Sequence, residues 1–200
     1  MHQYRGRMIL HTGSMFSGKT SSLEKDLKRF SIANYKVVAF KPLMDKRYAK
    51  NEIVTHDKIS LDAVEVESIN EILAYVEKYS PQVIGIDEVQ FLCDTPELVL
   101  EDLEKILDMG ITIVLAGLDM DYMAQPFEIV KELMPKVDYL NKHHAVCKKC
   151  GTDAWVSHRK IKSDKRVELG AVEEYEPLCR RCYREAREED KIRKNQENFL

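Results

Sequence analysis

The chain has 200 residues, 44% of them hydrophobic, and a formal net charge of −3 at pH 7. That length and apolar content suit one domain, or one domain with a small appendage, and they exclude a wholly disordered chain. The nearly balanced charges argue against broad nucleic-acid binding, and no apolar run approaches the ~20 residues of a membrane span. Because the N-terminal stretch is also too polar for a signal peptide, the sequence predicts a cytoplasmic protein.

The first motif is a phosphate-binding loop, GSMFSGKT at residues 13–20, which has the form G-x-x-x-x-G-K-[ST]. An apolar run at residues 8–10 predicts a strand directly before the loop. Apolar residues at helical spacing predict a helix after it: Leu23, Leu27 and Phe30. The alternative, a chance glycine-rich turn, is disfavoured because both flanks have the required pattern.

This loop predicts that the chain binds a nucleoside triphosphate. Its glycines admit backbone conformations closed to other residues, so the N–H groups can point at a phosphate. The ammonium of Lys19 would contact the outer phosphates, and the hydroxyl of Thr20 would ligate Mg²⁺. The predicted contacts are Gly13, Ser14, Met15, Phe16, Ser17, Gly18, Lys19 and Thr20.

A second buried strand is predicted at residues 36–40, ending at Lys41-Pro42 because proline cannot continue a central ladder. Asp45 and Arg47 follow at its carboxyl end, where open α/β sheets bind ligands, and they are candidates for metal and phosphate contacts. From this stretch alone, a solvated polar loop is the favoured alternative. Residues 51–63 show weak periodicity and predict no element.

The next strand carries the acids that a phosphate-binding loop requires. Ser68 and Glu71 form a capping box and predict a helix that ends near residue 80. Residues 83–86 then predict a buried strand followed by Asp87 and Glu88. Asp87 is expected to hold Mg²⁺, and Glu88, one residue further, is placed to act as a general base.

Strands and helices continue to alternate, which predicts a mostly parallel sheet flanked by helices. Thr95-Pro96 caps a helix that ends before Gly110, and residues 111–116 predict a strand. A further helix is expected at residues 127–133, ended by Pro135, and residues 139–146 form a candidate last strand.

Two C-x-x-C pairs mark a second, smaller domain. Two such turns can complete a tetrahedron of thiolates with no open position, so the sequence predicts a structural zinc ion held by Cys147, Cys150, Cys179 and Cys182. A redox dithiol is disfavoured, because it would not need a second pair. Cys93 stands alone and is expected to be a small core residue.

The segment between the pairs, residues 160–177, is polar and too long for a plain connection, so it is either functional or disordered. Residues from 185 onward predict a solvated helical tail or disorder. The expected domains are therefore an α/β nucleotide-binding domain at 1–143, a zinc domain at 144–184 and a charged tail at 185–200.

In their order along the chain, these motifs resemble the type II thymidine kinase family, from about Ile9 to about Tyr183. The matching segments are GSMFSGKT, DKRY, THD, IGIDEVQF, GLDMDY followed by PF, and the two C-x-x-C pairs. The resemblance implies transfer of the γ-phosphoryl group of ATP to the 5′-hydroxyl of deoxythymidine with Mg²⁺. It also implies a phosphate-loop α/β domain, a small zinc domain whose loop, the lasso, covers the nucleoside, a homotetramer, and dTTP as a feedback inhibitor.

The resemblance also implies roles for individual residues. Glu88 matches the catalytic base, and Asp87 matches the acid beside the metal. The nucleotide contacts would include Asp45, Arg47, Asp87, Glu88, Val89 and Gln90. The thymidine contacts would be Met15, Phe91, Tyr122, Phe127, Ser157, and the lasso residues Val167, Glu168, Leu169, Gly170 and Tyr175. Tyr122 stands where some members have phenylalanine, and the start of the lasso is unusually basic.

Two other functions remain as competing hypotheses. An ATP-driven nucleic-acid remodeller with a zinc ribbon is favoured only by the basic stretch 159–166, and the near-neutral charge argues against it. A non-catalytic nucleotide sensor is disfavoured by the intact Glu88. The residues by themselves predict ATP, Mg²⁺, a strand-end carboxylate and zinc; thymidine comes from the resemblance alone, and no nucleic-acid or membrane partner is expected.

Overall fold

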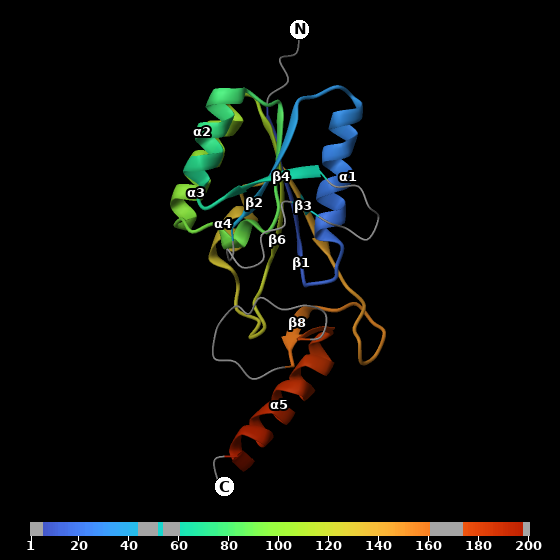
Figure 1. Cartoon of the computed structure of the whole chain (residues 1–200). Coiled ribbons are helices and arrows are strands. Elements are labelled where there is room, and N and C mark those ends of the chain that lie inside the picture. Colours follow the sequence, from blue (N-terminus) through green and yellow to red (C-terminus); the bar gives the residue numbers. More distant parts are fainter. Residues whose placement is uncertain (1–5, 44–51, 54–60, 161–173, 198–200) are drawn as a thin grey trace. The chain divides into compact units, whose positions relative to one another are not determined.

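A mostly parallel sheet forms the centre of the larger part of the chain in the computed structural model, which describes residues 6–43, 52–53, 61–160 and 174–197 (Figure 1). Within those ranges its strand order is β3-β4-β2-β5-β6-β1-β7. The strands are β1 (Met8–Gly13), β2 (Val37–Pro42), β3 (Glu52–Ile53), β4 (Leu61–Val66), β5 (Val83–Ile86), β6 (Thr112–Leu118) and β7 (Tyr139–His143). β2 pairs in parallel with β4 and β5, and β5 with β6, whereas β3 pairs antiparallel with β4.

Helices cover both faces of this sheet, as the alternating pattern predicts (Figure 1). One face is covered by α1 (Lys19–Ile32), and the other by α2 (Ile69–Tyr79), α3 (Pro96–Asp108) and α4 (Glu128–Leu133). A short 3-10 turn, η1 (Val89–Phe91), follows β5. The predicted α/β class is therefore confirmed.

The chain divides into two compact units. The sheet unit comprises residues 1–12, 19–119 and 127–142, and the cysteine unit comprises residues 13–18, 120–126 and 143–200. In the cysteine unit, β8 (Val156–Arg159) pairs antiparallel with β9 (Tyr175–Leu178), and α5 (Arg180–Glu197) follows. None of the helices in the described ranges is long and apolar enough to cross a membrane.

The core of the sheet unit explains why α1 lies where it does. Leu23 and Leu27 are fully buried against apolar residues of four strands: Ile9, Ala39, Val83, Val114 and Ala116. A β-carbon on Gly85 of β5 would lie 2.4 Å from Cδ1 of Leu27, so the helix approaches the strand at a position that has no side chain. The apolar spacing that predicted the helix is thus the face that packs.

The predicted N-terminal cap is present in α3 but not in α2. Thr95 caps α3 as expected, because its Oγ1 accepts a hydrogen bond from the Leu98 N–H at 3.4 Å. The capping box at Ser68 is wrong, because the Ser68 side chain makes no cap hydrogen bond. Asp94 instead accepts from the Ile69 N–H at 2.6 Å, and Glu71 accepts from the Glu67 N–H. A carboxylate from a distant loop has replaced the local cap.

Several other element boundaries differ from the predicted ones, in part because polar residues interrupt the apolar pattern of a strand. β3 and β4 lie within or beside residues 51–63, for which no element was predicted, because Asp62 and Glu65 interrupt the apolar pattern of β4. β7 ends at His143, short of the predicted residue 146. β9 lies at the end of the segment predicted to be a polar loop, and its pairing with β8 makes it a strand. Finally, α5 begins at Arg180 and continues past residue 184 to Glu197.

Candidate active site

The phosphate-binding loop begins at the end of β1 and leads into α1 (Figure 1). Gly13 has φ 138° and Gly18 has φ 83°, values that only glycine adopts readily. Phe16 also has a positive φ, 63°, which the sequence did not indicate, and its side chain is exposed. Within the cysteine unit, the Met15 N–H donates to Oγ of Ser157 at 2.8 Å, so β8 contacts the loop backbone.

Thr20, the second residue of α1, contacts the acid that follows β5. Oγ1 of Thr20 donates to both carboxylate oxygens of Asp87, at 3.1 and 3.2 Å. Asp87 is only 4% exposed. The structure therefore brings together the two residues that the sequence predicted as Mg²⁺ ligands, and a hydroxyl beside a carboxylate is an oxygen donor set that suits Mg²⁺.

Burial and nearby charges both shift the pKa values of Asp87 and Lys19 at this end of the sheet. Burial raises the pKa of Asp87 to about 7, helped by the adjacent Glu88 and opposed by Lys41. Lys19 is 7% exposed, and burial lowers its pKa, whereas Glu88, Asp87 and Asp119 act to raise it. A buried cation among several carboxylates is a site that can bind and polarise an anionic group.

Glu88 has an unusual backbone. Its φ and ψ are 51° and 42°, the left-handed region, immediately before η1. Its N–H donates to Oδ1 of Asp87 at 3.0 Å. Its Oε2 accepts from Nε2 of Gln90 at 2.5 Å, and Oε1 of Gln90 accepts from the Leu118 N–H at 3.1 Å. The side chain of Gln90 thus joins Glu88 to the end of β6.

The aromatic residues predicted for the nucleoside lie in two groups, one in each unit. In the sheet unit, the rings of Phe91 and Phe127 are 5.9 Å apart and cross at 77°. In the cysteine unit, Cζ of Arg159 lies 3.5 Å from the ring centroid of Tyr122. Tyr175 is buried in β9, in register with Arg159.

Several predicted site residues lie outside the described ranges, and the structure therefore says nothing of them. They are Asp45, Arg47, Val167, Glu168, Leu169 and Gly170.

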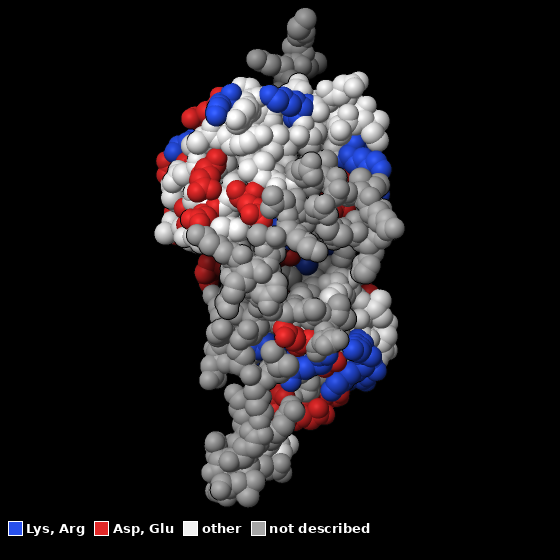
Figure 2. Space-filling view, viewed as in Figure 1, with Lys and Arg blue, Asp and Glu red and all other residues white. Residues whose placement is uncertain are grey.

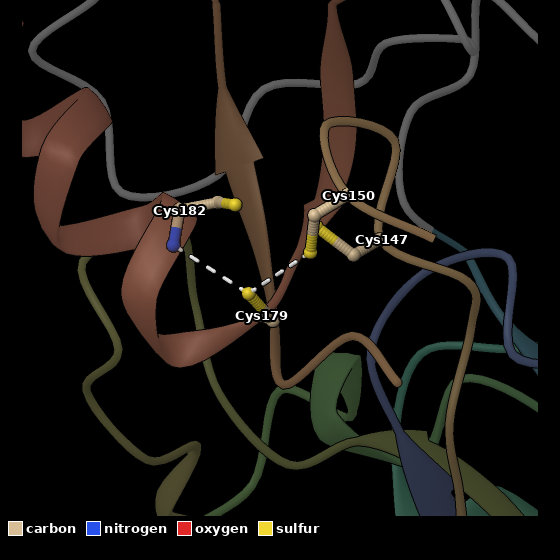
Figure 3. Close-up of side chains that lie close together, drawn as sticks. All are labelled: Cys147, Cys150, Cys179 and Cys182. Atoms are coloured by element: carbon tan, nitrogen blue, oxygen red, sulfur yellow. Dashed lines mark hydrogen bonds between the residues drawn. The ribbon is translucent and has the colours of Figure 1, made fainter. Parts of the chain in front are cut away.

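The four cysteines of the C-x-x-C pairs come together in the cysteine unit, and their Sγ atoms all lie within 4.8 Å of one another (Figure 3). Cys147 and Cys150 belong to the turn before β8, Cys179 lies between β9 and α5, and Cys182 lies in the first turn of α5. Sγ of Cys150 and Cys179 are 3.6 Å apart, and Sγ of Cys179 accepts from the Cys182 N–H at 3.5 Å. Four thiols at this spacing fit one tetrahedral metal ion.

The surroundings of these thiols are unequal. Hydrogen bonds from Thr152, foremost, lower the pKa of Cys150 to about 6, whereas burial raises the pKa of Cys182 to about 12. Apolar residues pack around the cluster: Ala145, Ala154, Val156, Leu178 and Ala186. The predicted core position of Cys93 is wrong, because this residue is exposed in the turn before α3.

Sequence reasoning assigned no role to three charged residues, two of them in the sheet unit and one in the cysteine unit. Asp119 is buried at the end of β6, near enough to affect Lys19, and its Oδ2 lies 2.9 Å from Nζ of Lys142. Lys41, the last residue but one of β2, acts on Asp87. Arg159 was noted only as the start of a basic stretch, yet it is 5% exposed and stacked on Tyr122. The segment GLDMDY, used only for its resemblance, was the one signal that pointed to Asp119.

Comparison with known proteins identifies the family of this chain. A family model described as thymidine kinase matches residues 6–183. The chain belongs to the thymidine kinase family. The resemblance drawn from the motifs is therefore confirmed at the level of the family.

Named relatives in the thymidine kinase family cover nearly the whole chain. A thymidine kinase of Bacteroides thetaiotaomicron is 42% identical over 186 residues, 93% of this chain and 91% of its own length. One from Porphyromonas gingivalis is 42% identical over 180 residues, 90% of this chain and 86% of its own. One from Roseiflexus is 35% identical over 187 residues, 90% of this chain and 96% of its own.

Proposed function

We propose that this protein is a thymidine kinase, which transfers the γ-phosphoryl group of ATP to the 5′-hydroxyl of deoxythymidine and yields dTMP and ADP. The observation that carries the proposal is the meeting of Thr20 with Asp87, beside Lys19 and Glu88, in a chain of this family. This is the combination of phosphate loop, metal acid and base that phosphoryl transfer requires.

The phosphates are bound by the loop at residues 13–20, with Asp45, Arg47, Val89 and Gln90 as further nucleotide contacts taken from the resemblance. Lys19 neutralises charge that develops on the transferring group, an electrostatic contribution that needs no movement of the protein. Thr20 and Asp87 would hold Mg²⁺, which supplies charge neutralisation of the phosphate oxygens when it is bound with ATP. The buried ammonium of Lys19 and the hydrogen bond from the Thr20 hydroxyl to the buried carboxylate of Asp87 support this assignment.

Glu88 is proposed as the general base. Its carboxylate accepts the proton of the 5′-hydroxyl as the oxygen forms its bond to the γ-phosphorus, while the bond from that phosphorus to the bridging oxygen of ADP breaks. The carboxylate of Glu88 lies on the first turn after β5, next to the proposed metal acid Asp87, which supports a reacting centre at this place.

Thymidine is proposed to contact Met15, Phe91, Tyr122, Phe127, Ser157 and Tyr175, together with residues 167–170. Support comes from chemistry: aromatic faces bind a base by stacking, and Ser157 accepts a hydrogen bond from Met15 while its own hydroxyl proton remains able to donate. The stacked guanidinium of Arg159 holds the Tyr122 ring from one side.

The cysteine cluster is proposed to hold a structural Zn²⁺ through Cys147, Cys150, Cys179 and Cys182, which would cross-link the two ends of the segment that carries β8 and β9. A homotetramer, inhibition by dTTP and a cytoplasmic location are further proposals that rest on the family resemblance.

The nucleic-acid remodeller is not favoured by any described residue. Arg159 is the first basic residue of the stretch that suggested a remodeller. Its side chain is buried against Tyr122 and is not exposed to a nucleic-acid strand. On the face shown in Figure 2, the described Lys and Arg residues of the sheet unit are scattered, and those of the cysteine unit lie beside Asp and Glu.

A panel of acceptors with MgATP tests the proposal. We expect ADP release to depend on deoxythymidine and to be unaffected by single-stranded or duplex DNA. The dTMP product is identified by mass spectrometry. The nucleosides of cytosine, guanine and adenine serve as comparison acceptors. DNA-dependent ADP release without dTMP would replace this function with the remodeller.

A further inference from the structure

The amide of Gln90 spans two elements of the sheet unit and uses both of its ends. Nε2 donates to Oε2 of Glu88 at 2.5 Å, and Oε1 accepts from the backbone N–H of Leu118, at the end of β6, at 3.1 Å. Gln90 is 7% exposed, so these hydrogen bonds are made away from bulk water. A short hydrogen bond between a buried donor and a carboxylate is among the stronger kinds.

The orientation of this amide is determined by its partners. The Leu118 N–H can only donate, so the atom facing it must be the oxygen, and the nitrogen then faces the Glu88 carboxylate. The reverse orientation would place two donors together at one end and two acceptors at the other. The anchoring strand therefore fixes a donor that points at Glu88.

The amide of Gln90 occupies space that is open because Gly117 of β6 has no side chain. A β-carbon on Gly117 would lie 2.8 Å from Oε1 of Gln90, 2.8 Å from Cγ1 of Val89 and 3.1 Å from Cγ2 of Val130. Contacts below 3.0 Å would displace the amide. Gly117 thus permits the approach of η1 to β6 on which the bridge depends.

Glu88 needs such support because its backbone is left-handed, with φ 51°. A residue with a β-carbon is rarely found there, and it persists only where the surroundings hold it. The N–H of Glu88 donates to Asp87 and holds the main chain, whereas the carboxylate of Glu88 accepts a hydrogen bond from the amide of Gln90 and interacts electrostatically with Lys19. Because a hydrogen bond is directional, the bond from Gln90 contributes to the orientation of that carboxylate.

We propose that Gln90 is a positioning residue for the base, which aims the Glu88 carboxylate at the acceptor hydroxyl and does not bind the nucleotide itself. The proposal rests on the proposed function of Glu88. It replaces the direct nucleotide contact that the family resemblance implies for Gln90 with an indirect role.

The first experiment compares Gln90→Glu with Gln82→Glu in the full-length, zinc-loaded protein. Gln90→Glu keeps the shape and the acceptor for Leu118 but replaces the donor with a second carboxylate, which repels Glu88. Gln82, the residue before β5, also accepts a hydrogen bond from a backbone N–H, because its Oε1 lies 2.9 Å from the Lys36 nitrogen at an exposed position. We expect kcat to fall about 10- to 100-fold in the Gln90 variant, the range that small misplacements of a reacting group cause, with KM for thymidine nearly unchanged. Gln82→Glu should leave both constants unchanged.

The second experiment asks whether Gln90 acts through Glu88. Gln90→Met, which keeps the length and removes both hydrogen bonds, is measured in the wild-type and in the Glu88→Gln background. A residue that acts only by aiming the base should lower kcat in the first background and cause no further loss in the second. Thermal unfolding and thymidine titration of each variant separate loss of positioning from loss of folding, since a folded variant still binds thymidine.

Three results would overturn the proposal. An equal loss of kcat in both backgrounds would show that Gln90 acts independently of Glu88. A raised KM for ATP with unchanged kcat would show that it is a nucleotide contact. Near-normal turnover of Glu88→Gln alone would show that Glu88 is not the base, and the proposal for Gln90 would fail with it. Because this single variant is measured before Gln90 is changed, the failure of the proposed function of Glu88 can be distinguished from the failure of the proposal for Gln90.

Discussion

The ammonium of Lys19 is buried at the first residue of α1, and three carboxylates act on it: Glu88, Asp87 and Asp119. Burial lowers its pKa, and the carboxylates oppose that effect. A cation held in this way is already oriented before a phosphate arrives, so the protein need not reorganise during transfer. Its loss should therefore affect the reaction more than the fold.

We predict that Lys19→Met lowers kcat by at least ~10², the size of effect seen when one preorganised donor is removed from a developing charge. The control is Lys25→Met, an exposed lysine on the same helix. Steady-state kinetics with MgATP and thymidine provide the measurement, with circular dichroism to confirm folding. Near-normal turnover in a folded Lys19→Met protein would contradict the role.

Asp87 links the site to pH. Burial, foremost, raises its pKa from the ordinary 3.8 to about 7 in the folded protein. Between these two values the folded protein keeps the proton and the unfolded chain has lost it, so folding takes up a proton. This residue therefore makes the free energy of unfolding decrease as pH rises from about 4 to 7, and its effect is constant above 7.

Asp87→Asn should remove that penalty in the metal-free, nucleotide-free protein. We predict that the variant unfolds at a higher temperature than wild type at pH 8, and that the difference shrinks as pH is lowered to 5. The change is at most about 1.4 kcal/mol for each pH unit. Calorimetry with a chelator present measures it, and Asp138→Asn is the control. A difference that does not vary between pH 5 and pH 8 would show that burial does not perturb Asp87.

At the scale of elements, the contact between α1 and β5 positions Lys19. Leu27 lies against Gly85, so the helix can approach the strand closely, and Lys19 and Thr20 occupy the first turn of that same helix. The closeness of the helix to the sheet therefore bears on the distance between Thr20 and Asp87, which follows β5 directly. The contact between Leu27 and Gly85 therefore bears both on the packing of the core and on the position of Thr20.

Gly85→Ala tests the contact. The added carbon would lie 2.4 Å from Leu27, and overpacking of this kind costs about 1–3 kcal/mol in the free energy of unfolding. Leu27→Ala alone should cost about 2–5 kcal/mol because it leaves a cavity. Urea unfolding of the double variant should show a loss smaller than the sum, since each change makes room for the other. Additive losses would mean that the two residues do not meet.

At the scale of the whole molecule, the cysteine cluster joins two distant stretches of the chain. Cys147 and Cys150 precede β8, which carries Ser157, and Cys179 and Cys182 follow β9, which carries Tyr175. Ordering each residue between them costs ~1–2 kcal/mol of backbone entropy, and a metal that holds both ends removes part of that cost before substrate binds. The proposed zinc should therefore matter to the nucleoside more than to ATP.

We predict that Cys179→Ser, or mild chelation, weakens thymidine binding at least ~10-fold and leaves the affinity for a non-hydrolysable ATP analogue nearly unchanged. Calorimetric titration of each ligand against zinc-loaded and zinc-depleted protein is the measurement. Cys93→Ser is the control, because this exposed cysteine lies apart from the cluster. Equal loss of both affinities would indicate general unfolding, and unchanged thymidine affinity would disprove the coupling.

The amino-acid sequence determined those features whose residues are close together in the chain. The loop at residues 13–20, the acids Asp87 and Glu88 after an apolar strand, and the paired cysteines each have a local pattern with one strong physical meaning. The order of these patterns was enough to identify the family, and the alternation of apolar strands and helices was enough to predict the α/β sheet.

Only the tertiary structure decided the features that join distant residues. The Asp94 cap on α2, the stacking of Arg159 on Tyr122, and the bridge from Glu88 through Gln90 to Leu118 each connect elements with no shared pattern in the sequence. β9 is a strand because β8 provides its partner, and Cys93 is exposed in the turn before α3. A hydrogen bond or a stacked ring depends on where separate elements meet, and that is settled by packing of the whole chain.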